Sequence, residues 1–346
     1  MKQNRTWAVV SVVAVLGLLL GSLGRQAEAQ AEKPIELIYH FPLAQATNTA
    51  VVQWWMDEVE KRTNGKVKFK RVWGGALGSL PEQPTNIRGR VFDLGNVSSV
   101  YSPGILAVET VTILPFLSDN FRAVQKAQND FIRSKVVQGQ YAGLNAQPLF
   151  AYTNEALEVI SYVRATTIEQ LKPLKIRAHG GAADALTAAG LTSVAIQWGE
   201  LSAAFERRVV DAAVVPIVAA RDTGFHELTK FVLRVPIYYF SWTVAMNVQA
   251  WNGLPKDIQG VMLEVALETP DKNTDLFEKK FIPEAWADFR KAGVQEVKWS
   301  EKEMAKFRAL GGEPVWNAWV KAMTAKGHDG QRILDDFRAL LTKHGG

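Results

Sequence analysis

The chain contains no cysteine among its 346 residues. This absence excludes disulfide bonds, thiolate metal sites and a cysteine nucleophile. Histidine is scarce, with five residues, and none stands at a metal-ligand spacing such as H-E-x-x-H. The nucleophile elbow G-x-S-x-G, the dinucleotide motif G-x-G-x-x-G and the phosphate-cradling P-loop are also missing. These absences favour a binding protein over an enzyme, and they indicate no cofactor and no metal.

The composition is that of an ordinary globular protein, with 47% hydrophobic and 22% charged residues. The length leaves room for about two domains with sizeable cores. The formal net charge of +5 comes from basic residues scattered among acidic ones. A nucleic-acid footprint would need a clustered basic stripe, so we expect no nucleic-acid partner.

Residues 1–29 have the features of a secretory signal peptide. Lys2 and Arg5 precede an apolar run over residues 8–23, and Ala27–Ala29 has the small-x-small form of a cleavage site. The alternative is an uncleaved membrane anchor, but the run is shorter than the roughly 20 residues that a spanning helix needs. We therefore predict cleavage and a periplasmic protein.

The chain after this peptide begins with the order strand, helix, strand. Residues 35–39 predict a strand, residues 49–62 a helix with one apolar face, and residues 67–72 a strand in which apolar and cationic side chains alternate. This order indicates a parallel sheet with a crossover helix, and hence an α/β fold.

Several later elements are expected from the same patterns. The prolines Pro270 and Pro283 should kink or break the long helical region. The expected elements are a helix over 121–141, a strand over 147–152, an apolar strand or helix start at 213–220, a strand over 242–247, a helical region from 255 to about 291, and two helices between 300 and 344.

Arg177 stands at the end of a predicted strand, residues 174–177. A short helix at 167–170 stops at Pro173 before this strand, and Gly180 and Gly181 separate the strand from a helix over 182–189. Ligands of open α/β sheets bind outside the carboxyl ends of the strands. Arginine can hold a carboxylate there through two parallel hydrogen bonds. We expect an anion anchor, and the alternative is an arginine that is solvated or paired with a nearby acid.

The segment Ile168–Arg177 resembles the "DLKGLKIR" core of the DctP-type solute-binding subunits of TRAP transporters. Other landmarks of this family occur in the expected order along nearly all of the chain after residue 29. They are Asn64–Val67, Gly75–Gly78, Gly89–Asp93, Leu114–Phe116, then Glu200, Ala204, Val210 and Asp211, and finally Asn247, Trp251, Leu254, Pro255 and Gln259.

This resemblance implies an α/β fold with two lobes of the periplasmic-binding-protein type. Each lobe would be a sheet flanked by helices, and a hinge and a long helix would join the lobes. We predict that residues 30–153 and 243–283 form lobe I and that residues 154–242 and 284–346 form lobe II.

The resemblance also implies a ligand site. In the family a strand-end arginine pairs with the carboxylate of the ligand, and Arg177 matches it. His40 and Ser98 fall at strand ends where relatives contact ligand, although they match no fixed residue. The alternatives are a capping or surface histidine and a turn hydroxyl. Tyr101 and Trp242 could wall the site, and the alternative for both is a place in the core.

The chain departs from its relatives at positions that bear on the ligand. Val215 replaces a frequent asparagine, and Leu157 replaces a frequent second arginine. A second carboxylate or many hydroxyls would therefore lack partners. We expect a small or partly apolar monocarboxylate, aromatic in view of the many tryptophans. Ala212 and Arg208 replace usual glycines, which leaves the turn geometry open.

The resemblance implies a solute-binding protein that delivers a small organic acid to TRAP permease subunits in the membrane. Size and composition suggest a monomer. Two alternatives remain at this stage. The chain could be a receptor that feeds a sensor system, or a periplasmic enzyme that acts on a carboxylate.

Overall fold

The computed structural model describes residues 33–44 and 46–346, so the predicted signal peptide lies outside the described part of the chain. The strands in this part are β1 (Ile35–Phe41), β2 (Val67–Trp73), β3 (Leu94–Val97), β4 (Ala146–Ser161), β5 (Lys175–Arg177), β6 (Thr192–Val194), β7 (Ala212–Pro216), β8 (Phe231–Arg234), β9 (Tyr239–Asn247) and β10 (Gln295–Lys298).

The helices of the same residues include short 3₁₀ segments and one π-helical turn. They are η1 (Thr47–Thr49), α2 (Ala50–Arg62), η2 (Gly75–Leu77), α3 (Gln83–Arg88), η3 (Val108–Ile113), α4 (Phe121–Phe131), α5 (Lys135–Gly143), α6 (Ile168–Leu171), α7 (Gly181–Ala188), α8 (Trp198–Glu206), α9 (Ile217–Asp222), α10 (Phe225–Leu228), α11 (Val248–Asn252), α12 (Lys256–Leu276), η4 (Phe277–Phe281, the π turn), α13 (Ile282–Lys291), α14 (Glu301–Gly311), α15 (Glu313–Ala325) and α16 (Gly330–Lys343).

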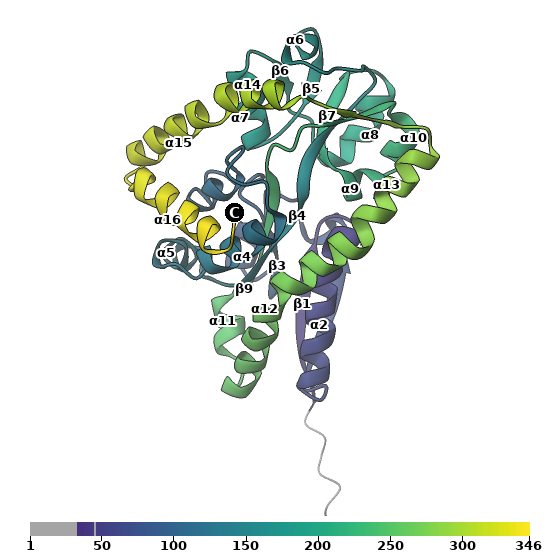
Figure 1. Ribbon diagram of the computed structural model, residues 1–346. Helices are drawn as coiled ribbons and strands as arrows, with labels where there is room; N and C mark the ends of the chain where they lie inside the picture. Colours follow the sequence, from purple (N-terminus) through teal and green to yellow (C-terminus); the bar gives the residue numbers. More distant parts are fainter. Residues whose placement is uncertain (1–32, 45) are drawn as a thin grey trace, which may run out of the picture. The chain divides into compact units, whose positions relative to one another are not determined.

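The long strand β4 joins two portions of one sheet (Figure 1). Its first part pairs with β9, and its second part pairs with β7 and β8. The order of strands is β2-β1-β3-β9-β4-β7-β5-β6, while β8 pairs with β4 and β10 pairs with β8. The strands β1 to β3 lie in the predicted lobe I and β5 to β7 in the predicted lobe II, while β4 and β9 run across the predicted boundaries.

The predicted strand–helix–strand start is confirmed by β1, α2 and β2. The apolar face of α2 is fully buried against the sheet. Its residues recur at helical spacing and are Val52, Trp55, Met56 and Val59. Burial of this stripe fixes the helix against the first portion of the sheet.

The long helical region is continuous where proline was expected to interrupt it. The segments α12, η4 and α13 follow one another without a break from Lys256 to Lys291 (Figure 1). Pro270 has no N–H for the carbonyl of Ala266, and the Thr269 hydroxyl donates to that oxygen instead, at 2.8 Å. The π turn η4 comes directly before α13, and Pro283 is the second residue of α13.

Three further expectations are corrected or refined. The helix expected over 121–141 is two helices, α4 and α5. The tail holds three helices, α14 to α16, where two were expected. The apolar segment 213–220 supplies both a strand and a helix start, β7 and α9, because Pro216 lies at the junction.

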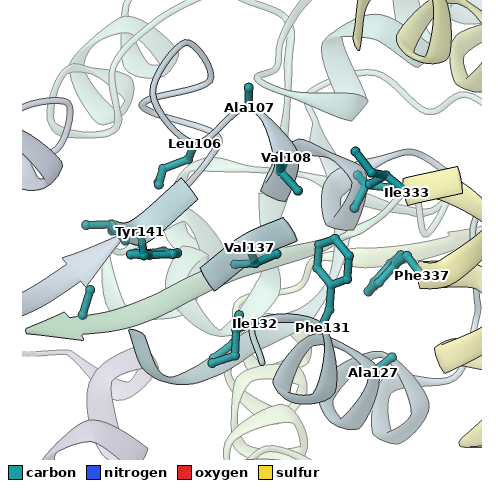
Figure 2. Packing of buried hydrophobic residues seen from close by; sticks show 14 of the residues in the cluster. Leu106, Ala107, Val108, Ala127, Phe131, Ile132, Val137, Tyr141, Ile333 and Phe337 are labelled. Atoms are coloured by element: carbon teal, nitrogen blue, oxygen red, sulfur yellow. The ribbon is translucent and has the colours of Figure 1, made fainter. Parts of the chain in front are cut away.

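One hydrophobic core lies where α4, α5, η3 and α16 meet (Figure 2). The rings of Phe131 and Phe337 face each other there, with centroids 5.3 Å apart in an edge-to-face arrangement. A second core packs β7, α8 and α9 against α13 around Phe205, Phe225 and Phe289. The two cores support the two portions of the sheet, with β4 running between them.

Candidate functional site

A cavity of about 730 Å³ lies between the two portions of the sheet. It is lined by η1 and the start of α2 on one side, and by the ends of β5 and β7, the start of α8 and the later part of α9 on the other. Residues of β4 and β9 form its floor. This volume suits a small organic molecule.

Arg177 lines this cavity from the carboxyl end of β5, as predicted for its place on the sheet. Only 5% of the residue is exposed. Its Nε donates to the Ile196 carbonyl at 3.0 Å, and its Nη1 donates to the Val214 carbonyl at 3.3 Å. Burial lowers the pKa of the guanidinium, and the nearby Tyr101 and Tyr238 oppose this effect.

The charge of Arg177 has no ion-pair partner among the described residues. A guanidinium carries five N–H donors, and two of them are used by the carbonyls. Three donors of a buried cation therefore remain for a ligand. A carboxylate is the group that best matches this fork.

Two glycines let the chain turn sharply after Arg177. Gly180 has φ +54°, in the region that favours glycine. At Gly181 a Cβ atom would lie 1.9 Å from the Ile113 carbonyl oxygen. Only a glycine permits this close approach between α7 and the end of η3, which holds the loop next to the cavity in place.

Aromatic side chains form a large part of the cavity wall. Tyr101, Phe240 and Trp242 contact one another, with ring centroids between 5.0 and 5.9 Å apart. The guanidinium carbon of Arg177 lies 5.8 Å from the centroid of the Trp198 ring. The structure thus places Tyr101 and Trp242 in the wall, where the sequence suggested them.

His40 and Ser98 are not among the residues that line the cavity. The His40 ring is buried and makes two hydrogen bonds. Its Nε2 lies 2.9 Å from the Gly74 carbonyl oxygen, and its Nδ1 lies 3.1 Å from Gln83 Nε2. Because an amide nitrogen donates and a carbonyl accepts, these contacts assign the ring proton to Nε2. Burial also lowers its pKa.

The Ser98 hydroxyl accepts from the backbone N–H of Val100, at 3.3 Å. This is the turn hydroxyl considered as the alternative from the sequence. The polar atoms of His40 and Ser98 are thus engaged by neighbouring residues away from the cavity. Their expected contact with ligand finds no support in this geometry and stays a prediction.

Several lining residues were not anticipated from the sequence. His179 shares the Ile196 carbonyl with Arg177, through Nε2 at 2.8 Å, and burial next to that charge lowers its pKa. Trp198 stands two positions before Glu200, which is one of the family landmarks, and this nearness was a usable signal. Asn154 carried no signal, because it stands between two other polar residues of β4, Thr153 and Glu155.

The turn that the sequence left open has a defined geometry. Arg208 adopts φ +58°, a left-handed conformation that favours glycine. Its guanidinium lies over the Tyr162 ring, 3.1 Å from the centroid. This stacking offsets part of the backbone strain.

The family model for DctP, described as bacterial extracellular solute-binding protein, family 7, matches residues 40–322. The chain belongs to this family. The DctP family is one of solute receptors, so the resemblance inferred from the motifs is confirmed. The match includes most of the described residues and all elements that line the cavity.

Among curated relatives, the 2,3-diketo-L-gulonate-binding periplasmic protein YiaO of Escherichia coli K12 is 24% identical over 292 residues. The alignment covers 82% of this chain and 85% of that protein. The ectoine-binding periplasmic protein TeaA of Halomonas elongata is 21% identical over 290 residues, covering 82% and 76%.

Solved structures of DctP-type proteins share the fold. A marine metagenome TRAP solute binding protein specific for aromatic acid ligands, in complex with metahydroxyphenylacetate, has a TM-score of 0.83 at 21% identity, covering 90% of this chain and all of that one. A TRAP solute binding protein of Rhodoferax ferrireducens T118, with copurified benzoate, has a TM-score of 0.82 at 22% identity, covering 90% and 98%. These matches confirm the predicted two-lobed α/β fold.

Membership in an extracellular solute-binding family places the function of this DctP protein outside the cytoplasm. In the described part of the chain, no helix is both long and apolar enough to cross a bilayer. The same residues contain no group of three or more His, Cys, Asp or Glu that could hold a metal ion.

Proposed function

We propose that this DctP protein captures a small monocarboxylate with an aromatic or partly apolar body and delivers it to the permease of a TRAP transporter. The observation that carries the proposal is Arg177, a buried cation that forms no ion pair within the described part of the chain and keeps three donors for the cavity. Burying such a charge is costly unless a partner compensates it, and a ligand carboxylate is that partner.

The cavity offers one cation for one carboxylate. Arg177 is the one arginine or lysine among the described residues that line it. Leu157 and Val214 lie in the same wall, and Asp222 at the rim is an acid already paired with Arg221 at 2.7 Å. A second ligand carboxylate would face apolar surface or this acid, which supports the expected monocarboxylate.

The aromatic wall favours a flat ligand. Tyr101, Phe240 and Trp242 surround the cavity with ring surface, on which an aromatic ring can stack or pack edge to face. Two solved relatives carry metahydroxyphenylacetate and benzoate according to their descriptions. These aromatic acids are the first ligands that we would test.

Closure of the two proposed lobes would enclose the ligand. At the rim, the Thr47 N–H donates to Asp222 Oδ2 at 3.0 Å, and Arg221 donates to the Thr47 hydroxyl at 3.1 Å. These bonds join η1 to α9 across the cavity. Excluding water from the cavity strengthens the ion pair with Arg177.

The remaining parts of the proposal concern place and assembly. We infer that the signal peptide, residues 1–29, is cleaved and that the mature chain is a periplasmic monomer. Residues 30–153 with 243–283, and residues 154–242 with 284–346, would be the two lobes that move about β4, β9 and the helical path from α12 to α13. The closed form would dock on the membrane subunits.

The proposal is tested by a thermal-shift screen of residues 30–346 against small carboxylic acids, in the wild type and in Arg177→Ala. A ligand at a hundred times its Kd adds about 2.7 kcal/mol to the apparent stability. Arg133→Ala is the control for loss of an arginine, because Arg133 forms no ion pair within the described residues and lies away from the cavity.

We expect acids to raise the Tm of the wild type and of Arg133→Ala, and to leave the Tm of Arg177→Ala unchanged. If no acid raises the Tm of the wild type, the chain does not bind this class of ligand. If Arg177→Ala responds like the wild type, the anchor is another residue.

A further inference from the structure

The strand β4 is irregular where it passes the cavity. It pairs with β9 at Thr153 opposite Ser241 and again at Ala156 opposite Tyr239, so its register shifts between these pairs. Such irregularities re-aim side chains next to binding sites. Asn154 falls within the shifted stretch, is 2% exposed and lines the cavity.

The orientation of the Asn154 amide is fixed by Trp242. The indole Nε1 donates to Asn154 Oδ1 at 3.1 Å. An indole N–H can only donate, so the amide oxygen must face the tryptophan and the amide nitrogen must point elsewhere. Trp242 is itself held by Phe41 and Phe240, whose ring centroids lie 5.2 and 5.0 Å from its own.

The amide nitrogen of Asn154 has no hydrogen-bond partner among the described residues, although it is buried. Buried polar groups are nearly always hydrogen-bonded, so this donor requires a partner. Its oxygen is already used by Trp242, and the residue lines the cavity. Because the residue lines the cavity, a ligand bound there can supply the missing partner once the side chain of Asn154 adjusts to it.

A carboxylate alone does not account for this donor. Arg177 keeps three N–H groups, which are enough to bind both oxygens of one carboxylate. The Asn154 donor is additional and carries no charge. It suits a neutral acceptor oxygen, such as a hydroxyl, an ether or a carbonyl, on the body of the ligand.

We propose that Asn154 determines specificity by donating to a neutral oxygen of the ligand, so that the chain prefers oxygen-bearing aromatic acids to their hydrocarbon analogues. This inference rests on the proposed function, because it presupposes a carboxylate at Arg177. An analogue without the oxygen leaves the buried donor unpaired. We expect it to bind about tenfold to a hundredfold more weakly.

The experiment measures Kd by calorimetry for matched pairs of acids, in the wild type, Asn154→Ala and Trp242→Phe. The pairs are the 2-, 3- and 4-hydroxybenzoates and the methylbenzoates with the substituent at the same position. A methyl group and a hydroxyl have similar size, so the ratio of the two Kd values isolates the hydrogen bond.

In the wild type we expect a ratio of at least ten at one ring position. Asn154→Ala should reduce this ratio to within about twofold of one, while the Kd of the methyl acid stays within a few-fold of the wild-type value. Trp242→Phe keeps the amide but frees it to rotate, so the ratio should fall to an intermediate value.

Two results would overturn the inference while leaving the proposed function in place. The first is that acids bind the wild type with a ratio near one at all three positions. The second is that Asn154→Ala weakens both acids of a pair equally, which would make Asn154 structural. If no benzoate of either kind binds the wild type, the proposed aromatic ligand class itself fails and the inference falls with it.

Discussion

Replacing Arg177 with methionine should weaken acid binding at least about 30-fold and yet change the free energy of unfolding of the ligand-free protein very little. The expectation follows from the contacts of this side chain. It donates to two carbonyls and pairs with no acid among the described residues. An arginine kept for a ligand differs in this respect from an arginine that completes a structural ion pair.

The stability effect combines two opposing contributions. Hydrogen bonds from a charged donor contribute about 1.5–3 kcal/mol each, so losing the bonds to Ile196 and Val214 costs roughly 3–6 kcal/mol. Removing the buried guanidinium recovers a desolvation penalty of several kcal/mol. Methionine also fills most of the vacated volume. We expect a net change of less than about 2 kcal/mol.

The binding effect has no such compensation. Removing one partner of a buried charge pair costs about 2–5 kcal/mol, which weakens binding roughly 30-fold to several-thousand-fold. Urea unfolding of the ligand-free proteins gives the first quantity, and calorimetry with an aromatic acid gives the second.

Arg234→Met is the matched control. Arg234 lies outside the cavity and pairs with the buried Glu158 at 2.9 Å. Its loss should cost at least about 2 kcal/mol of stability and leave acid binding intact. A loss of more than 3 kcal/mol in ligand-free Arg177→Met, or binding as tight as in the wild type, would refute the assignment of Arg177 as an anchor.

Three further predictions concern the surroundings of the site. The Glu155 carboxyl accepts a hydrogen bond from Val218 N–H, and burial raises its pKa to about 7. Between the ordinary pKa of a glutamate and pH 7, the folded state therefore keeps a proton that the unfolded state has lost. The wild type therefore loses stability as pH rises toward 7, whereas Glu155→Gln does not. The free energy of unfolding of Glu155→Gln, measured by urea titration, should gain up to about 3 kcal/mol over that of the wild type between pH 5 and 8, and a constant difference would contradict this. Arg208→Gly should be more stable than Arg208→Ala by about 1 kcal/mol in thermal unfolding, because both variants lose the stacking on Tyr162 and only alanine is strained at φ +58°. Equal stabilities would show that the turn relaxes. Asp222→Ala removes the acceptor of Thr47 N–H and an ion-pair partner of Arg221. It should lower the Tm and speed ligand release about fivefold in stopped-flow fluorescence, whereas an unchanged rate would exclude this contact from closure.

The sequence by itself determined the elements whose signals are local. The helix α2 follows from an apolar stripe at helical spacing, and β5 follows from alternation between two breaks. Arg177 could be placed at the end of β5 for the same reason, because a strand end is defined by the residues next to it. The family motifs added the two-lobed fold, since five weak landmarks in order constrain the whole chain.

Tertiary structure alone decided which side chains share the cavity. Asn154 and Trp198 reach it from elements far apart in the sequence, and no local pattern records that convergence. His40 carries a suitable group at a strand end, yet its ring turns to Gly74 because burial there requires a partner for each nitrogen. Likewise the helix passes Pro270 because the Thr269 side chain supplies the missing donor. The residue types are written in the sequence, whereas the direction of each side chain depends on contacts that exist only after the chain has folded.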